Sequence, residues 1–153
     1  MNTALMKSMT TKADFYILPG SDEDSRYQFL NKLMARVLNA DHKVYIHTDS
    51  EAQAQLIADR LWQAPAEMFL PNQLPEESLH APISLGWLSN HLPSEPDLLV
   101  NLSQVTPDKT YDFNRISEII IQDETVLAIT RQRFKDYKTA NIEAKMHDMR
   151  RGN

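Results

Sequence analysis

The sequence contains no cysteine and only three glycines among its 153 residues. Without cysteine the chain has no thiol nucleophile, disulfide, iron–sulfur ligand or zinc-finger pattern, which fits a reducing compartment. With glycine only at positions 20, 86 and 152, neither G-x-x-x-x-G-K-[ST] nor G-x-G-x-x-G can be written. These absences exclude thiol chemistry and the common phosphate-binding loops, and we expect no cofactor.

Long apolar runs are missing as well. The N-terminal segment 1–12 lacks the apolar core of a secretory signal, and no later stretch approaches the ~20 apolar residues of a membrane helix. We therefore expect a cytoplasmic protein without a membrane partner. The length, with 42% hydrophobic and 24% charged residues, fits one globular domain.

Charge is distributed unevenly along the chain. Residues 131–153 carry seven Lys or Arg against three acids, whereas residues 1–130 carry nine against 18. An acidic body repels a nucleic-acid backbone, so we expect little direct DNA binding. The basic C-terminal segment is the place where an anionic partner could bind.

Apolar runs and helical periodicities alternate along the chain. Such alternation predicts a three-layer, Rossmann-like α/β domain with a mainly parallel sheet and helices on both faces. We assign 1–12 to a flexible extension, 13–147 to the domain and 148–153 to a flexible basic tail. Strands are expected at 15–18, 43–48, 98–102 and 116–121, with at most one more near 83–85, and helices at 25–40, from 51 to Pro65, and from 123 to about 145.

Acidic residues follow the first two predicted strands. Asp22, Asp24 and Asp49 would lie at the carboxyl edge of the sheet, where they could bind Mg²⁺ in a small phosphotransfer or nuclease domain. The alternative is that acids gather at helix N-termini because the helix dipole favours them there. No recognisable catalytic set accompanies them, so we favour the second interpretation and expect neither a metal nor enzymatic activity.

The last predicted helix carries an aromatic side chain among cations. Its i, i+4, i+7, i+8 and i+11 spacing places these residues along one face. They could form a solvated basic face with the aromatic ring in the core, or a site for a peptide with acidic and apolar groups. The residues are Leu127, Arg131, Phe134, Lys135 and Lys138.

A second aromatic group follows the second predicted helix. Trp62 is expected at the helix edge near Phe69 and Pro71. These residues could form a small satellite core under the loop or an exposed contact for a partner.

The segment 61–71 also carries a resemblance. It reads L-W-x-x-P-A-E-x-F-x-P, and together with 15–18, 43–54 and 131–138 it is similar to the chi subunit family of bacterial DNA polymerase III. The resemblance implies a non-catalytic, Rossmann-like accessory subunit of the clamp-loader assembly, acting at replication forks. It would bridge that assembly, through the psi subunit, to the acidic C-terminal tail of single-stranded DNA-binding protein.

The resemblance also implies residue roles. Arg131, Phe134, Lys135 and Lys138 would bind the tail, with Ile120 as a pocket wall, and Trp62, Phe69 and Pro71 would face psi. Leu127 stands where the family has a lysine, so the resemblance implies either a weaker affinity for the tail or compensation by Lys138 and Arg133.

Overall fold

The computed structural model describes residues 11–151 and contains one seven-stranded sheet. The strand order is β3-β4-β2-β5-β6-β1-β7, and all six neighbouring pairs run parallel. The strands are β1 (Lys12–Ile17), β2 (Val44–His47), β3 (Asn72–Gln73), β4 (Ile83–Gly86), β5 (Leu98–Asn101), β6 (Arg115–Ile120) and β7 (Glu143–Asp148). The parallel α/β sheet predicted from the sequence is confirmed.

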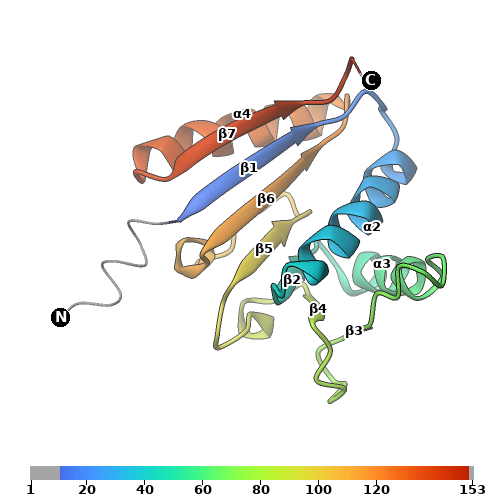
Figure 1. Cartoon of the computed structure of the whole chain (residues 1–153). Coiled ribbons are helices and arrows are strands. Elements are labelled where there is room, and N and C mark those ends of the chain that lie inside the picture. Colours follow the sequence, from blue (N-terminus) through green and yellow to red (C-terminus); the bar gives the residue numbers. More distant parts are fainter. Residues whose placement is uncertain (1–10, 152–153) are drawn as a thin grey trace.

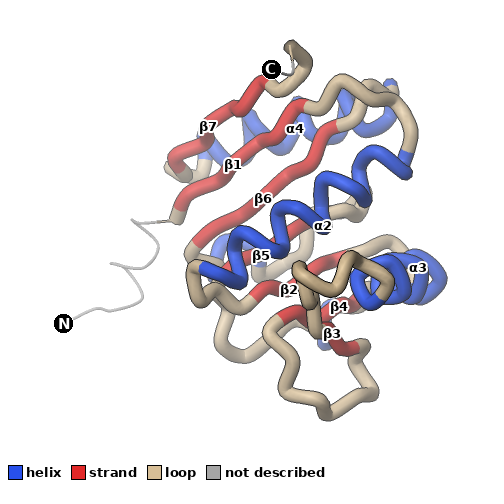
Figure 2. Tube along the Cα trace, turned by 45° about the vertical axis from the view of Figure 1, so that its right-hand side comes forward, coloured by secondary structure: helices blue, strands red, loops and turns tan. Residues whose placement is uncertain are grey.

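Three α-helices cover the two faces of the sheet. Helices α2 (Glu23–Asn39) and α3 (Glu51–Trp62) lie on one face, and α4 (Glu124–Thr139) lies on the other (Figure 1). The view turned by 45° shows the same three layers (Figure 2). Helix α4 packs on β6 and the edge strand β7, and α3 packs on β4 and the edge strand β3. The two helices therefore lie near opposite ends of the sheet (Figure 2).

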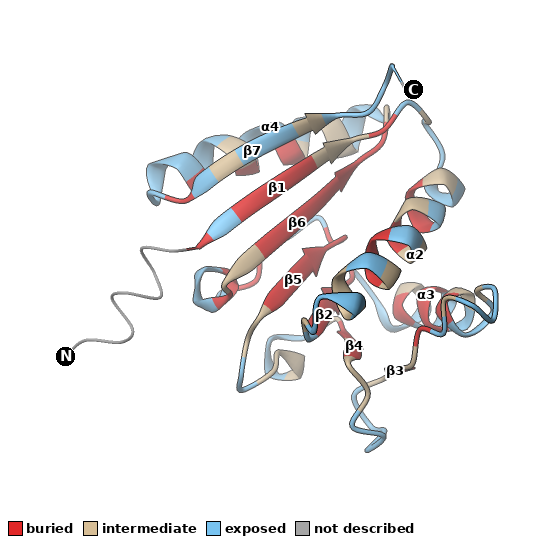
Figure 3. Cartoon of the chain, viewed as in Figure 1, coloured by how far each residue is buried: buried red, intermediate tan, exposed pale blue. Residues whose placement is uncertain are grey.

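Two hydrophobic cores hold the layers together. The larger one joins the apolar stripes of α2 and α3 to one face of the sheet, for example Leu33 and Ile57 to Val100. The smaller one joins α4 to the opposite face through residues such as Phe15 and Tyr137. Figure 3 shows the buried residues in red, along the central strands of the sheet and on parts of the helices.

Helices α3 and α4 begin where the sequence indicates, whereas α2 begins at Glu23, two residues before its predicted start. Asp22, Ser50 and Asp123 cap α2, α3 and α4, and each side chain accepts a hydrogen bond from the backbone N–H three residues later. In α3 the apolar residues that recur at helical spacing are buried: Ala54, Ile57, Ala58 and Leu61. The apolar periodicity therefore located the core face of this helix correctly.

The prediction for the end of α4 is wrong. The helix ends at Thr139 rather than near Lys145, and β7 follows it as an edge strand. Asn141 has a φ of 63°, and Ile142 N–H donates to Tyr137 O at 2.9 Å, so the chain leaves the helix through a left-handed residue. Ile142 is buried and guides β7 alongside β1.

The segment 63–97, between α3 and β5, contains two strands, whereas at most one was predicted there. Besides β4, the two-residue β3 pairs with it through Asn72 and Gln73. The first ten residues of the predicted extension 1–12, and residues 152–153 of the predicted tail, lie outside the described residues. The described sheet begins at Lys12 and ends at Asp148.

Candidate peptide-binding site

A hollow of about 190 Å³ lies between α4 and the carboxyl ends of three strands. We call it the α4 pocket. Its apolar lining comes from β1, β6, β7 and α4, and its charged lining consists only of cations. The lining residues are Ile17, Ile120, Gln122, Leu127, Thr130, Arg131, Phe134, Lys135, Met146 and Arg150.

The structure brings five of the six predicted tail-binding residues together in this pocket. Ile120 is the buried strand residue, Leu127 and Phe134 are partly buried, and Arg131 and Lys135 are exposed at the rim. A carboxylate could therefore approach the guanidinium of Arg131 from solvent.

Lys138, the sixth residue, does not line the pocket. Its ammonium Nζ lies 4.9 Å from the centroid of the Phe134 ring, which is within the range of a cation–π contact. Lys138 therefore adds positive charge beside the pocket and contacts one of its walls.

Phe134 combines the two roles that the sequence left open. Its ring packs edge-on against Phe15, with centroids 5.3 Å apart, and it joins the smaller core. It also lines the pocket. Because the core fixes one edge of the ring, the other surface is held in place for a ligand.

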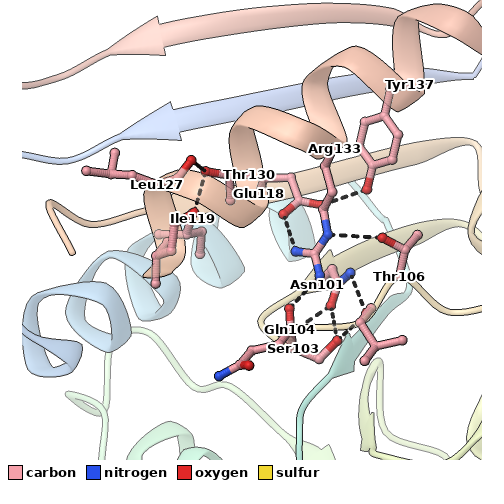
Figure 4. Close-up of polar contacts among 12 residues, drawn as sticks. Asn101, Ser103, Gln104, Thr106, Glu118, Ile119, Leu127, Thr130, Arg133 and Tyr137 are labelled. Atoms are coloured by element: carbon pink, nitrogen blue, oxygen red, sulfur yellow. Dashed lines mark hydrogen bonds and ion pairs between the residues drawn. The ribbon is translucent and has the colours of Figure 1, made fainter. Parts of the chain in front are cut away.

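Arg133 does not face the pocket, contrary to the expectation that it could replace a missing cation. Its side chain is only 3% exposed and lies inside the fold (Figure 4). Nη1 donates to Glu118 Oε1 at 3.0 Å, Nη2 to Ser103 O at 2.6 Å, and Nε to Thr106 Oγ1 at 3.1 Å. This arginine therefore ties α4 to β6 and to the loop after β5.

Glu118 is a buried ionisable residue that the sequence analysis did not identify. Its carboxylate is fully buried, and Tyr137 Oη donates to Oε2 at 2.7 Å. Burial raises the pKa of Glu118, and the opposing effects of Arg133 and Tyr137 do not cancel this. Burial, together with the Glu118 charge, also raises the pKa of Tyr137. We interpret this network as structural support for α4.

The predicted psi-facing residues lie on a separate surface at the end of α3. Trp62 is 52% exposed and Phe69 is 71% exposed, and Pro71 is partly buried. Leu70, between the last two, is buried and anchors the loop. No ring contact joins Trp62 to Phe69 in the described part of the chain. Their exposure argues against a satellite core at these two side chains.

The three acids considered for Mg²⁺ have structural partners. Asp22 Oδ1 accepts from Ser25 N–H at 3.0 Å, which lowers its pKa, and Asp24 pairs with Arg60. Asp49 Oδ1 accepts from Gln104 N–H at 2.7 Å. Within residues 11–151 no group of three or more His, Asp or Glu side chains is arranged to hold a metal ion. The helix-terminus interpretation therefore fits Asp22 best.

A second hollow, of about 240 Å³, lies at the carboxyl edge of the sheet between the starts of α2 and α4. Both acids and arginines line it, including Glu23, Asp49, Asp123 and the buried Arg26. Arg26 Nε donates to Ile119 O at 3.0 Å, so this arginine also serves the fold.

In the described chain no helix is long and apolar enough to cross a membrane.

Comparison with known proteins gives a consistent result. The family model described as "DNA polymerase III chi subunit, HolC" matches residues 9–145. Three proteins named DNA polymerase III subunit chi are similar to the chain. The Pseudomonas aeruginosa protein is 30% identical over 141 residues, covering 92% of this chain and 99% of the relative. The Haemophilus influenzae protein is 33% identical over 132 residues and the Escherichia coli protein 25% over 136, each covering 85% of this chain and 92% of the relative.

Proposed function

This chain belongs to the DNA polymerase III chi subunit family, and from that premise we propose that it is a non-catalytic accessory subunit of the clamp-loader assembly. In this proposal it binds the acidic C-terminal tail of single-stranded DNA-binding protein in the α4 pocket and the psi subunit at the end of α3. It thereby links the polymerase assembly to protein-coated DNA in the cytoplasm.

The observation that carries the tail-binding proposal is the composition of the α4 pocket. Its floor is apolar, its charged lining residues are all cations, and it belongs to a chain with a formal net charge of −5. A peptide with acidic residues and an apolar end matches both properties at once.

The tail would make three kinds of contact in this pocket. The Arg131 guanidinium would donate two parallel hydrogen bonds to the terminal carboxylate of the tail. An apolar side chain would enter the pocket against Phe134 and Leu127. Lys135 and Lys138 would attract the acidic residues that precede it.

The contacts of Lys135 and Lys138 are exposed, and each is therefore modest in strength. Many tails are present on one coated DNA strand, so multivalency would raise the effective affinity. The chain itself needs no catalytic group for this tethering role.

The psi-binding proposal is supported by the aromatic surface at residues 62–71. Trp62 and Phe69 are large, exposed and close in sequence, and aromatic side chains of this kind dominate many interfaces. The clamp loader would be reached only indirectly, through psi.

The alternative of a Mg²⁺-dependent phosphotransfer or nuclease domain requires Asp22, Asp24 and Asp49 to act together. Each of these carboxylates already binds a group of the fold. Thermal melting with and without Mg²⁺ distinguishes the proposals, since a site for the ion raises the melting temperature by mass action.

The test of the proposed function is fluorescence anisotropy with a labelled peptide that carries the acidic tail of the organism's own single-stranded DNA-binding protein. Arg131→Ala should lower the affinity at least about tenfold, because a lost charge-assisted contact costs about 1.5–3 kcal/mol. Arg36→Ala, which removes an exposed arginine of α2, is the matched control and should leave binding unchanged. Equal affinities for both variants would overturn the proposal.

A further inference from the structure

The two walls of the α4 pocket come from different parts of the chain. One wall is α4 itself, with Arg131 and Lys135. The other wall includes Met146 of β7 and Arg150, which follows that strand. A bound peptide would therefore meet cations both from α4 and from the end of β7.

Arg150 is held beside the pocket by the backbone. Met149 N–H donates to Ile17 O at 2.8 Å, which continues the pairing of β7 with β1 beyond the end of the strand. Ile17 is itself a pocket residue. The position of Arg150 is thus fixed by the sheet and not only by its own flexible side chain.

The only carboxylate that binds Arg150 within residues 11–151 is that of Asp148. Arg150 Nε donates to Oδ1 at 2.9 Å and Nη2 to Oδ2 at 2.7 Å, and the backbone N–H adds a third bond to Oδ1 at 3.0 Å. These bonds hold the pKa of Asp148 well below its usual range. Asp148 is therefore charged at neutral pH and competes for the guanidinium.

Both members of this pair are exposed to solvent. Their side chains are 52% and 46% exposed, and an ion pair in such a position has little net stability. A carboxylate from a ligand in the pocket can replace Asp148 at small cost, because the guanidinium keeps an equivalent partner.

We propose that Arg150 is a specificity-determining residue of the α4 pocket, which takes a carboxylate of the bound acidic peptide in exchange for Asp148. This inference rests on the proposed function. In this inference Arg150 is the second cation of the site, on the side of β7. Asp148 competes with the ligand for the guanidinium of Arg150. A peptide with a single acidic group would engage only one wall, so the arrangement selects for ligands with several acids.

The experiment measures the affinity of the same labelled tail peptide for the full-length parent and four variants. Arg150→Ala should weaken binding about three- to fivefold, because an exposed ion pair contributes only modestly to affinity. Arg151→Ala is the matched control, since this neighbouring arginine does not line the pocket, and it should stay within about twofold of the parent. Asp148→Asn should bind about twofold more tightly because the competitor loses its charge.

Arg131→Ala separates this inference from the proposed function. If the parent binds and Arg131→Ala fails, but Arg150→Ala and Arg151→Ala bind equally well, the role of Arg150 is refuted and the pocket stands. If the parent itself does not bind the peptide, the proposed function fails and the inference with it. Melting temperatures of all variants should match the parent, because the substituted side chains are exposed.

Discussion

Arg133 and Phe134 are neighbours in α4, yet the first is buried against Glu118 and the second lines the α4 pocket. Consecutive helical residues point about 100° apart, so fixing one side chain fixes the direction of the next. The ion pair between Arg133 and Glu118 therefore sets which side of α4 faces the pocket.

Breaking this ion pair should destabilise the protein strongly. Glu118→Gln leaves the Arg133 charge buried without its counter-charge, and such a change typically costs about 3–5 kcal/mol. The double variant Glu118→Leu/Arg133→Met should cost less than Glu118→Gln, since no buried charge remains, although Tyr137 Oη and Ser103 O each lose a partner. Urea denaturation of both variants checks this. If the single-substitution variant Glu118→Gln were as stable as the parent, the pair would not support the fold.

Salt should weaken binding of the acidic tail peptide. The cations at the rim, Arg131 and Lys135, are exposed, and exposed charges are screened over a Debye length of ~10 Å at 0.1 M salt. Titrations at increasing salt should give a steadily falling affinity. An affinity that does not change with salt would mean that the apolar lining alone carries the binding.

The psi-facing surface should act independently of the α4 pocket. Trp62→Ala should lower the affinity for psi about thirtyfold or more, as for other interface tryptophans, and psi should no longer co-purify with the variant. The affinity for the tail peptide should stay within about twofold of the parent. Leu88→Ala is a suitable control, because Leu88 is 51% exposed and Trp62 is 52% exposed.

A melting temperature lowered together with both binding activities would contradict this prediction. It would mean that Trp62 supports the core and that the two surfaces are not separate.

Acid should destabilise the protein partly through Asp97. Burial alone would raise the pKa of Asp97, but bonds from Lys43 N–H at 3.0 Å and from His42 and Asn114 outweigh it and lower the pKa. A lowered folded-state pKa stabilises the fold above the unfolded value, and this contribution is lost as the pH falls through the lower folded value.

The free energy of unfolding should therefore decline as the pH falls below about 4, near the ordinary aspartate value. Asp97→Asn should be less stable than the parent at pH 7, and the difference should shrink in acid. Urea midpoints across this pH range measure the effect. A difference that stays constant with pH would assign the loss to packing and not to the charge.

The sequence predicted the sheet because its apolar runs coincide with buried strands. Ile46, Val100 and Ile116 all lie in such runs and are buried. Leu127, Arg131, Phe134 and Lys135 were predicted together because helical spacing and the family resemblance agree on one face of α4, whereas Ile120 of β6 came from the resemblance alone.

The sequence did not reveal the other half of the pocket. Met146 and Arg150 were not identified because the sequence prediction extended the last helix to about residue 145 and assigned 148–153 to a flexible tail, whereas the left-handed Asn141 ends the helix early and β7 follows. Arg133 was misplaced for a different reason. Its burial depends on Glu118, which lies on β6, and no local pattern encodes that pairing.

The position of the tail peptide can be measured by titrating it into the ¹⁵N-labelled protein and following the backbone amide signals by NMR. We expect the largest changes in residues 127–138 of α4 and in residues 146–150, at the end of β7 and just beyond it, with few changes at 62–71. Changes that cluster at 62–71 or at the carboxyl edge around Asp49 and Asp123, with α4 unaffected, would show that the acidic tail does not bind in the α4 pocket.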